Sequence, residues 1–193
     1  AWSLVMAAGV SAVLALIQWA GLEGNLAPFV AQASPGMAYG NLRQPNQLAS
    51  LLAMGIWASF WLWRNPAHAQ RPAVLLVYLL LLTAAMVASA SRIGLVHIAV
   101  LCGACLWWWW FVDRPAQRDR AWLLPAFSLS VAVVYFSWLM LAPWLENLGG
   151  SQRDLMDRLS QGEATCGSRL ILWRNVLHLI NLKPLTGWGW GNL

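Results

Sequence analysis

The stretch PAVLLVYLLLLTAAMVASASRIGLVHIAVLCGACLWWWWFV, from Pro72 to Val112, decides the fold because Arg92 is its single charged residue. As one continuous α-helix it would be about 60 Å long, roughly twice the ~30 Å hydrocarbon core of a bilayer. The polar sequence Ser89-Ala90-Ser91-Arg92 interrupts it near the middle. We therefore expect two membrane-spanning helices, Pro72–Ala90 and Ile93–Val112, with a reversal of the chain at Arg92.

Three more stretches of membrane-spanning length surround this pair. They are Trp2–Ala20, Pro45–Trp63 and Ala121–Trp144. Hydrophobic residues make up 60% of the chain and charged residues 10%, whereas soluble domains contain about 25% charged residues. Backbone polar groups in lipid must be paired within their own segment, and these stretches are too long for barrel strands. We therefore predict an all-α, polytopic transmembrane bundle with five spans.

The predicted domains follow from where the apolar stretches stop. Residues 1–144 are expected to form the five transmembrane helices with short loops, and residues 145–193 the start of a large loop outside the membrane. The chain begins at Ala1 without an initiator methionine and stops within that loop. We therefore expect a piece of a larger membrane protein that lacks both ends.

Basic residues indicate which side of the membrane each loop faces. Loops 64–71 and 113–120 hold five basic residues in sixteen positions, whereas the opposite side holds seven in about seventy-five. This density predicts that the short loops are cytoplasmic under the positive-inside rule, although the raw counts favour the other side. Trp107–Trp110 lies beside loop 113–120 and is interpreted as a membrane anchor.

Three arginines on the predicted outer side are the candidate binding residues. Arg43 precedes Pro45, Arg92 opens the fourth span, and Arg169 is expected to open a helix over about 168–181. A cation at a helix N-terminus opposes the helix macrodipole by about 0.3–1 kcal/mol, so local helix stability does not explain these positions. A shared anion would explain them, because helix N-termini and guanidinium groups both suit phosphate oxygens. The alternative for each arginine alone is contact with lipid headgroups or a surface salt bridge.

The helix over 168–181 is predicted to be amphipathic. Arg169 falls on its apolar face, which directs a charge towards protein or membrane rather than water. The apolar face is formed by Leu172, Trp173, Val176, Leu177 and Ile180.

The remaining polar residues give no second candidate site. Cys102 and Cys105 form a C-x-x-C inside a span and are interpreted as packing residues, and Cys166 is alone on the outer side. His97 either lines a polar cavity or forms an interhelical contact, and we favour the contact. The sequence contains no serine triad, metal-ligand cluster or phosphate-binding loop, so neither a metal nor a cofactor is expected.

Three motifs, taken together, resemble the O-antigen ligase and polymerase superfamily. Arg169–Asn192, with LWRN followed by PLTGWGWGN, is similar to part of that superfamily's large periplasmic loop, and Ser89–Leu95 (SASRIGL) is similar to its Ser-Arg-Thr/Ile-Gly segment. Asn41–Ala49 (NLRQPNQLA) resembles a motif of the bacterial protein O-oligosaccharyltransferases that glycosylate pilins. The motifs occur in family order across most of the chain.

The resemblance implies a GT-C-like, metal-independent transferase of the bacterial inner membrane with a periplasmic active face. Such enzymes move a glycan from undecaprenyl diphosphate to an acceptor hydroxyl on a pilin-like protein or on lipid A-core. The superfamily's arginines at the positions of Arg92 and Arg169 are implied to hold the diphosphate, which agrees with the anion site expected from the helix starts. We expect Arg43 nearby or at the rim of that site. Its catalytic histidine lies further along the loop, beyond residue 193, and His178 does not take that role.

Several alternatives remain open on the sequence alone. The same superfamily includes O-antigen polymerases, and a non-enzymatic transporter of lipid-linked oligosaccharide would also need outer arginines. Gly187, Gly189 and Gly191 are expected to let the backbone approach the glycan, or else to form an ordinary flexible turn. The expected partners are the lipid-linked glycan, its acceptor and membrane lipids, and no nucleic acid.

Overall fold

The computed structural model describes residues 1–33, 38–64, 72–113, 122–149 and 162–188, and every regular element in these ranges is helical. The protein is therefore an all-α helical membrane protein, as predicted. The chain divides into two units, Ala1–Leu155 and Met156–Leu193, which are described separately.

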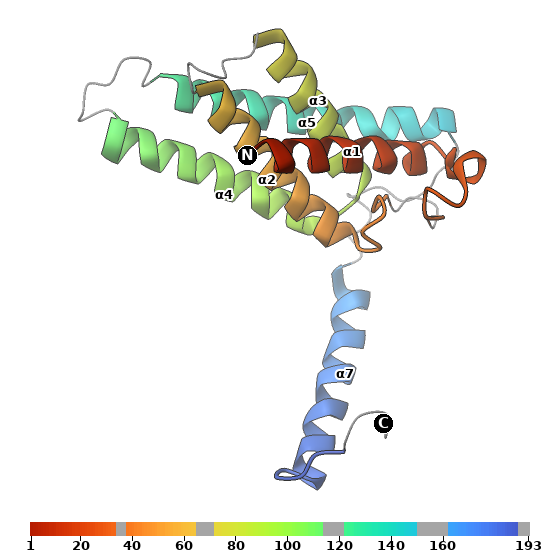
Figure 1. Cartoon of the computed structure of the whole chain (residues 1–193). Coiled ribbons are helices and arrows are strands. Elements are labelled where there is room, and N and C mark those ends of the chain that lie inside the picture. Colours follow the sequence, from red (N-terminus) through yellow and green to blue (C-terminus); the bar gives the residue numbers. More distant parts are fainter. Residues whose placement is uncertain (34–37, 65–71, 114–121, 150–161, 189–193) are drawn as a thin grey trace. The chain divides into compact units, whose positions relative to one another are not determined.

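The first unit contains five long helices (Figure 1). Proline occupies the first position of the second and third helices, where its missing N–H costs nothing. The helices are α1 (Trp2–Trp19), α2 (Pro45–Arg64), α3 (Pro72–Ala88), α4 (Arg92–Trp108) and α5 (Leu123–Gly149), with a 3-10 turn at Glu23–Leu26 and a π-helical turn at Trp109–Asp113.

The break between α3 and α4 falls where the sequence predicts it. α3 ends at Ala88 and α4 begins at Arg92. Between them Ala90 has a φ of 46°, a left-handed conformation that ends the first helix and redirects the chain. The prediction that the fourth span is α-helical to Val112 is wrong in its last turn, because the chain widens there into the π-helical turn.

Successive helices run in opposite directions (Figure 1), so their ends form two groups. At one end Ser91 bonds to Asn46, and the backbone of Ala38 bonds to Ala88. At the other end Arg64 bonds to Asp113. We call these the arginine end, which carries Arg43 and Arg92, and the ion-pair end.

Small residues bring α1 and α2 close together. Ala8, Ala12 and Ala15 have no exposed surface and form a stripe along α1. A Cβ atom at Gly55 of α2 would lie 2.3 Å from the Cβ of Ala8, so a residue larger than glycine cannot fit there unless the helices separate. Close contact between small residues is a common way for membrane helices to associate.

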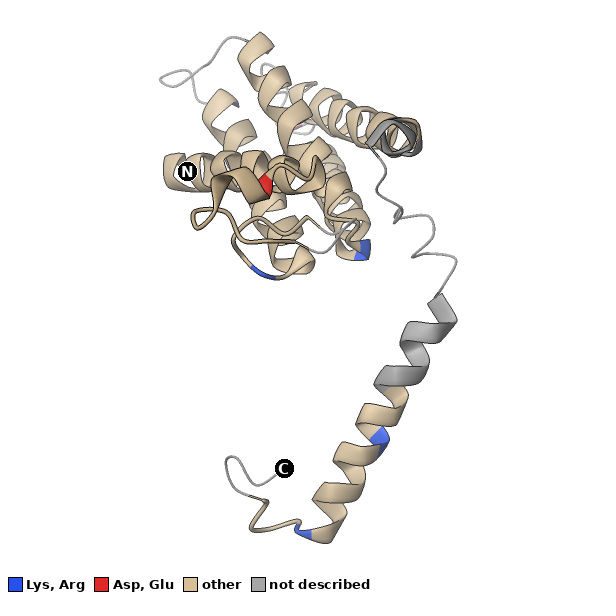
Figure 2. Cartoon of the chain, turned by 90° about the vertical axis from the view of Figure 1, so that its right-hand side faces the viewer, with Lys and Arg blue, Asp and Glu red and all other residues tan. Residues whose placement is uncertain are grey.

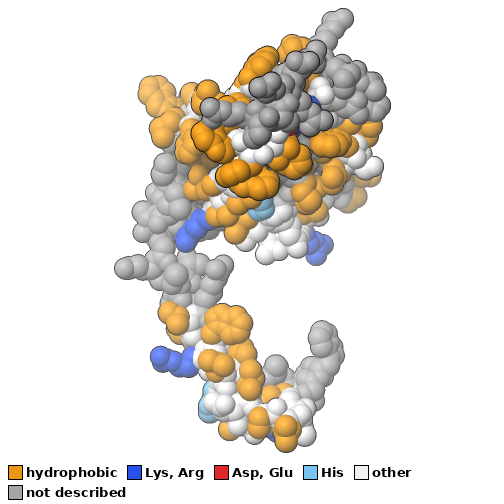
Figure 3. All heavy atoms as spheres, turned by 90° about the vertical axis from the view of Figure 1, so that its left-hand side faces the viewer, with side chains coloured by type: hydrophobic (Ala, Val, Ile, Leu, Met, Phe, Trp, Pro, Cys, Tyr) orange, Lys and Arg blue, Asp and Glu red, His pale blue; other side chains and the backbone are white. Residues whose placement is uncertain are grey.

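The surface of the first unit suits a lipid environment. Figure 3 shows hydrophobic side chains covering much of one face, and Figure 2 shows few charged residues on the described part of the bundle. Among the described residues, three helical segments are long and apolar enough to cross a membrane: Trp2–Trp19, Arg92–Asp113 and Leu123–Ala142. α3 is an apolar helix of 17 residues. For α2 and α3, membrane crossing stays a prediction.

The second unit is built on α7 (Gly162–Leu182). The predicted start of this helix, near Ser168, is wrong, because the helix begins at Gly162 and Arg169 lies in its interior. The sequence has no proline between Gly162 and Leu182, and an interior glycine or serine costs at most about 1 kcal/mol, so nothing forces a later start.

The described part of α7 exposes apolar side chains. Leu172, Trp173, Leu177 and Ile180, which belong to the predicted apolar face, are each more than half exposed within this unit. Val176 is half-buried. Within this unit the predicted apolar face is therefore exposed, and it can contact lipid or another part of the protein.

Candidate functional site

The arginine end brings Arg43 and Arg92 to the N-termini of two neighbouring helices. Arg43 lies two residues before α2, and Arg92 is the first residue of α4. Both side chains are exposed. The two helix starts are joined by a hydrogen bond of 2.7 Å from Ser91 Oγ to Asn46 Oδ1. The structure therefore brings Arg43 and Arg92 to one end of the bundle, and their binding of a common anion stays a prediction.

Ser91 occupies the N-cap position of α4 without capping it. Its side chain makes no hydrogen bond to the helix backbone and instead reaches across to Asn46 of α2. An N-cap serine normally accepts a hydrogen bond from the N–H groups of the first turn. At this helix start the hydroxyl joins two helices instead, and the positive end of the helix dipole faces the same end of the bundle as the two guanidinium groups.

A second polar contact lies about one turn deeper. Ser50 of α2 and His97 of α4 approach to 3.3 Å between Oγ and Nε2, and His97 Nδ1 lies 2.8 Å from the carbonyl oxygen of Ile93. Since a carbonyl only accepts, Nδ1 carries a proton. His97 is therefore the interhelical histidine that the sequence analysis favoured, and it helps to fix α2 against α4 beneath the arginines.

The backbone at Arg43 is held in an uncommon conformation. Its φ of 58° lies in the left-handed region, which residues other than glycine, asparagine and aspartate rarely adopt. Such conformations persist only where the surrounding structure imposes them, and they are frequent at binding sites. Sequence patterns gave no sign of this strain.

The ion-pair end has a different character. Arg64 Nη2 donates to Asp113 Oδ2 at 2.7 Å, and the carboxylate is completely buried. The pair joins the end of α2 to the π-helical turn. Trp107, Trp108 and Trp110 are exposed, as expected for anchors at a membrane interface, whereas Trp109 packs against the core.

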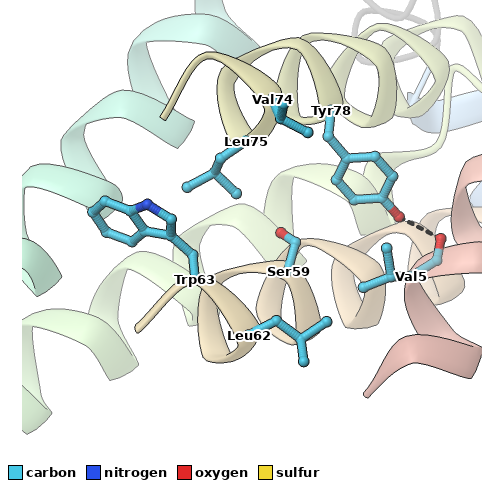
Figure 4. Close-up of a pocket in the computed structure, with 7 residues that line it drawn as sticks. All are labelled: Val5, Ser59, Leu62, Trp63, Val74, Leu75 and Tyr78. Carbon is cyan, nitrogen blue, oxygen red and sulfur yellow. Dashed lines mark hydrogen bonds between the residues drawn. The ribbon is translucent and has the colours of Figure 1, made fainter. Parts of the chain in front are cut away.

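A small pocket lies between α1, α2 and α3 towards the ion-pair end (Figure 4). Its volume is about 60 Å³, too small for a sugar ring. Its two hydroxyl groups already donate to backbone carbonyls, Tyr78 to Val5 at 2.6 Å and Ser59 to Ile56 at 2.8 Å. The pocket is therefore a packing defect rather than a chemical site. It is lined by Val5, Ser59, Leu62, Trp63, Val74, Leu75 and Tyr78.

The second unit carries the other predicted residues. Arg169 lies within α7, so the proposal that it shares a ligand with Arg92 stays a prediction. Gly187 has a φ of 62°, and a Cβ added there would meet no atom within 4 Å, which leaves room for a ligand to approach the backbone. Gly189 and Gly191 lie outside the described residues.

The turn after α7 is held by Trp188. Its indole Nε1 donates to the carbonyl oxygen of Leu179 at 3.0 Å, and Lys183 Nζ lies 4.3 Å from the centre of its ring. These contacts fold the start of the glycine and tryptophan segment back onto the end of α7. His178 is exposed on the helix.

Neither cysteine chemistry nor a metal cluster is found in the described parts of the chain. Cys105 is fully buried in the core and Cys102 packs against it, with its Sγ atom 3.5 Å from the carbonyl oxygen of Ser128. The described residues contain no group of three or more side chains suited to hold a metal ion. The interpretation of Cys102 and Cys105 as packing residues agrees with their place in the core.

A family model described as O-Antigen ligase matches residues 77–193, more than half of the chain and the part that includes Arg92 and Arg169. The chain belongs to the O-antigen ligase family. A second model, described as Protein glycosylation ligase, matches residues 38–63, which include Arg43 and the start of α2.

One relative supports the same grouping. The chain is 25% identical over 188 residues to a "General O-oligosaccharyltransferase" of Acinetobacter baylyi. The match covers 94% of this chain and 31% of that protein, so the chain spans about a third of the relative's length. No solved structure matches the chain.

Proposed function

We propose that this member of the O-antigen ligase family transfers a glycan from undecaprenyl diphosphate to an acceptor hydroxyl, without a metal ion. The observation that carries the proposal is the pairing of Arg43 and Arg92 at adjacent helix starts, joined through Asn46 and Ser91. Two guanidinium groups beside two positive helix ends suit a diphosphate. The segment that resembles the protein-ligase motif favours a pilin-like protein as acceptor over lipid A-core.

In this mechanism the arginines act on the leaving group. As the bond between the anomeric carbon and the lipid diphosphate breaks, negative charge increases on the departing phosphate oxygens. Arg43, Arg92 and Arg169 would neutralise that charge, which is the main electrostatic task of the step. The acceptor hydroxyl would attack the anomeric carbon and give its proton to a histidine beyond residue 193, as the family resemblance implies. Gly187, Gly189 and Gly191 would allow close approach of the glycan.

Arginine-to-lysine substitutions in the intact protein test the diphosphate site. Lysine keeps the positive charge but loses the bidentate geometry, so Arg92→Lys and Arg169→Lys should each lower the transfer rate by about tenfold or more. Arg174→Lys, on the exposed surface of α7, is the matched control and should transfer normally.

The two arginines should also be coupled. Alanine at both positions should lower the transfer rate by a factor far smaller than the product of the two single reductions, because both side chains act on one leaving group. Wild-type transfer by the lysine variants, or losses that simply multiply, would refute a shared site.

The two alternative functions, polymerase and transporter, predict different results. An O-antigen polymerase would use a second lipid-linked glycan as acceptor, so transfer would depend on that glycan and not on a pilin. A transporter would move the lipid-linked glycan across the membrane without forming a new glycosidic bond. Assays with purified donor and purified acceptor separate these outcomes.

We further propose that the arginine end faces the periplasm of the inner membrane. In a cysteine-free background, a cysteine at the exposed Asn25 should react with a membrane-impermeant thiol reagent in intact spheroplasts, and one at Gln70 should not. Labelling at Gln70 alone would reverse the orientation.

A further inference from the structure

Gln18, near the end of α1, is a buried polar residue with no part in the proposed chemistry. It is 5% exposed and lies three residues beyond Ala15, at the end of the alanine stripe. Its Nε2 donates to the carbonyl oxygens of Ala31 and Gly40, both at 2.8 Å. Its Oε1 accepts from the backbone N–H groups of Tyr39, at 3.0 Å, and Gly40, at 2.8 Å.

These four hydrogen bonds join α1 to the segment that leads into α2. A glutamine side chain has two N–H donors and one oxygen with two acceptor positions, so Gln18 is fully satisfied. Gly40 also packs closely on α1, because a Cβ added there would lie 3.3 Å from the carbonyl oxygen of Ser11. The segment is therefore attached to α1 both by hydrogen bonds and by direct contact.

Asn41 adds two hydrogen bonds to the same part of the chain. Its Nδ2 donates to the carbonyl oxygen of Phe29 at 2.8 Å, and its Oδ1 accepts from the N–H of Ala31 at 3.0 Å. Arg43 follows two residues later, in the left-handed conformation, and α2 begins two residues after it. The chain between Gly40 and Pro45 is thus fixed at both ends, by Gln18 and Asn41 on one side and by the start of α2 on the other.

The packing of α1 does not depend on Gln18. The alanine stripe and the contact between Ala8 and Gly55 already hold α1 against α2. All four hydrogen bonds of Gln18 go instead to the segment before Arg43. A buried amide that makes its hydrogen bonds to one segment fixes the position of that segment.

We infer that Gln18 is a positioning residue for Arg43: it holds Ala31, Tyr39 and Gly40 so that Arg43 is presented, in its strained conformation, at the diphosphate site. The inference rests on the proposed function, because Gln18 would affect glycan transfer only by positioning Arg43. Misplacing a binding group by about 1 Å costs on the order of a hundredfold in rate, so loss of this anchor should be visible in kinetics.

A double-mutant cycle in the intact protein tests the inference. Gln18→Met keeps the length and approximate volume of the side chain and removes its hydrogen bonds. Arg43→Asn removes the guanidinium while keeping a residue type that tolerates the left-handed conformation. Gln18→Met should lower kcat/KM for the lipid-linked donor by about tenfold or more in the Arg43 protein, and by less than about twofold in the Arg43→Asn protein.

Tyr78→Phe is the matched control. It removes a partly buried hydrogen bond between α3 and α1 near the opposite end of α1, at Val5. Its effect on kcat/KM should be small and equal in both backgrounds, even if it lowers thermal stability as much as Gln18→Met does. If Gln18→Met does not fold, Asn41→Ala loosens the same segment from an exposed position and should show the same dependence on Arg43.

The outcomes separate the two proposals. If Arg43→Asn loses activity but Gln18→Met lowers kcat/KM equally in both backgrounds, or in neither, the positioning role is overturned and the diphosphate site stands. If Arg43→Asn transfers normally, Arg43 has no part in the site, and both its proposed role and the role of Gln18 are overturned.

Discussion

The buried carboxylate of Asp113 accepts a hydrogen bond of 2.7 Å from Arg64, although the two residues are 49 positions apart in the sequence. Arg64 is the last residue of α2, and Asp113 ends the π-helical turn that follows α4. The ion pair therefore joins α2 to α4 at the end opposite the arginines, whereas the Asn46–Ser91 and Ser50–His97 contacts join the same two helices near their starts. α2 and α4 are connected at both ends.

Breaking this ion pair should destabilise the bundle, and the effects of substituting its two partners should not be additive. Arg64→Met and Asp113→Asn each remove a charge from a contact in which one partner is fully buried. We expect each to lower the thermal midpoint, and the double variant to be less destabilised than the sum of the two, with a coupling on the order of 1 kcal/mol. Thermal unfolding of the purified protein in detergent measures all three. Strictly additive losses would show that the contact contributes nothing to stability.

Two glycines should respond in opposite ways to alanine. At Gly55 the new Cβ would lie 2.3 Å from that of Ala8, so α1 and α2 would have to separate, at a cost of about 1–3 kcal/mol. At Gly103 of α4 no atom lies within 4 Å of the added Cβ, and the better helix propensity of alanine should stabilise by up to about 1 kcal/mol. Thermal midpoints in detergent provide the comparison. Equal effects at the two sites would contradict the close packing of α1 on α2.

Much of the fold follows from residues that lie next to one another in the sequence. Pro45, Pro72 and the Ser89–Ser91 break mark helix boundaries because their effects on the backbone are local. The alternation of helix directions then follows from the length of the spans. The placement of Arg43 and Arg92 at one end of the bundle could be predicted for the same reason.

Other features depend on contacts between distant residues and could not be predicted. The π-helical turn contains Asp113, whose ion-pair partner lies 49 residues earlier. Gln18 gives no signal in the sequence, because its four bonds go to backbone atoms of a segment 13 to 22 residues away. The preference of serine for the N-cap position predicts a start of α7 at Ser168, yet serine is also tolerated inside a helix, and α7 begins at Gly162.

Replacing Arg43 should lower activity without lowering stability. Glycine adopts the left-handed conformation without a steric penalty, so Arg43→Gly should leave the free energy of unfolding unchanged or raise it by up to about 1 kcal/mol. The same variant should transfer glycan poorly because it lacks the guanidinium, whereas Arg43→Lys should keep part of the activity. Thermal midpoint and transfer rate are measured on the same preparations. A stable Arg43→Gly variant with wild-type transfer would show that the strained residue has no functional role.

A negative charge at Asn46 should weaken binding of an anionic donor without loosening the helices. Asn46 Oδ1 accepts the hydrogen bond from Ser91, and Asn46→Asp keeps an oxygen acceptor in that place. The added carboxylate would lie three residues after Arg43 in the sequence. It would also accept the hydrogen bond of Ser91, which precedes Arg92. Its attraction for the arginines and its repulsion of phosphate should raise KM for the lipid-linked donor by about three- to tenfold, with kcat less affected.

Salt separates this electrostatic effect from a structural one. Exposed charges are screened over about 10 Å at 0.1 M ionic strength and about 3 Å at 1 M, so the rise in KM should shrink as salt is added. Asn25→Asp adds the same charge at another exposed position on the arginine end and is the matched control, with a smaller effect expected. The KM of both variants is measured at low and high salt against the wild type. Equal shifts in the two variants, or a shift that salt leaves unchanged, would count against an anion site between Arg43 and Arg92.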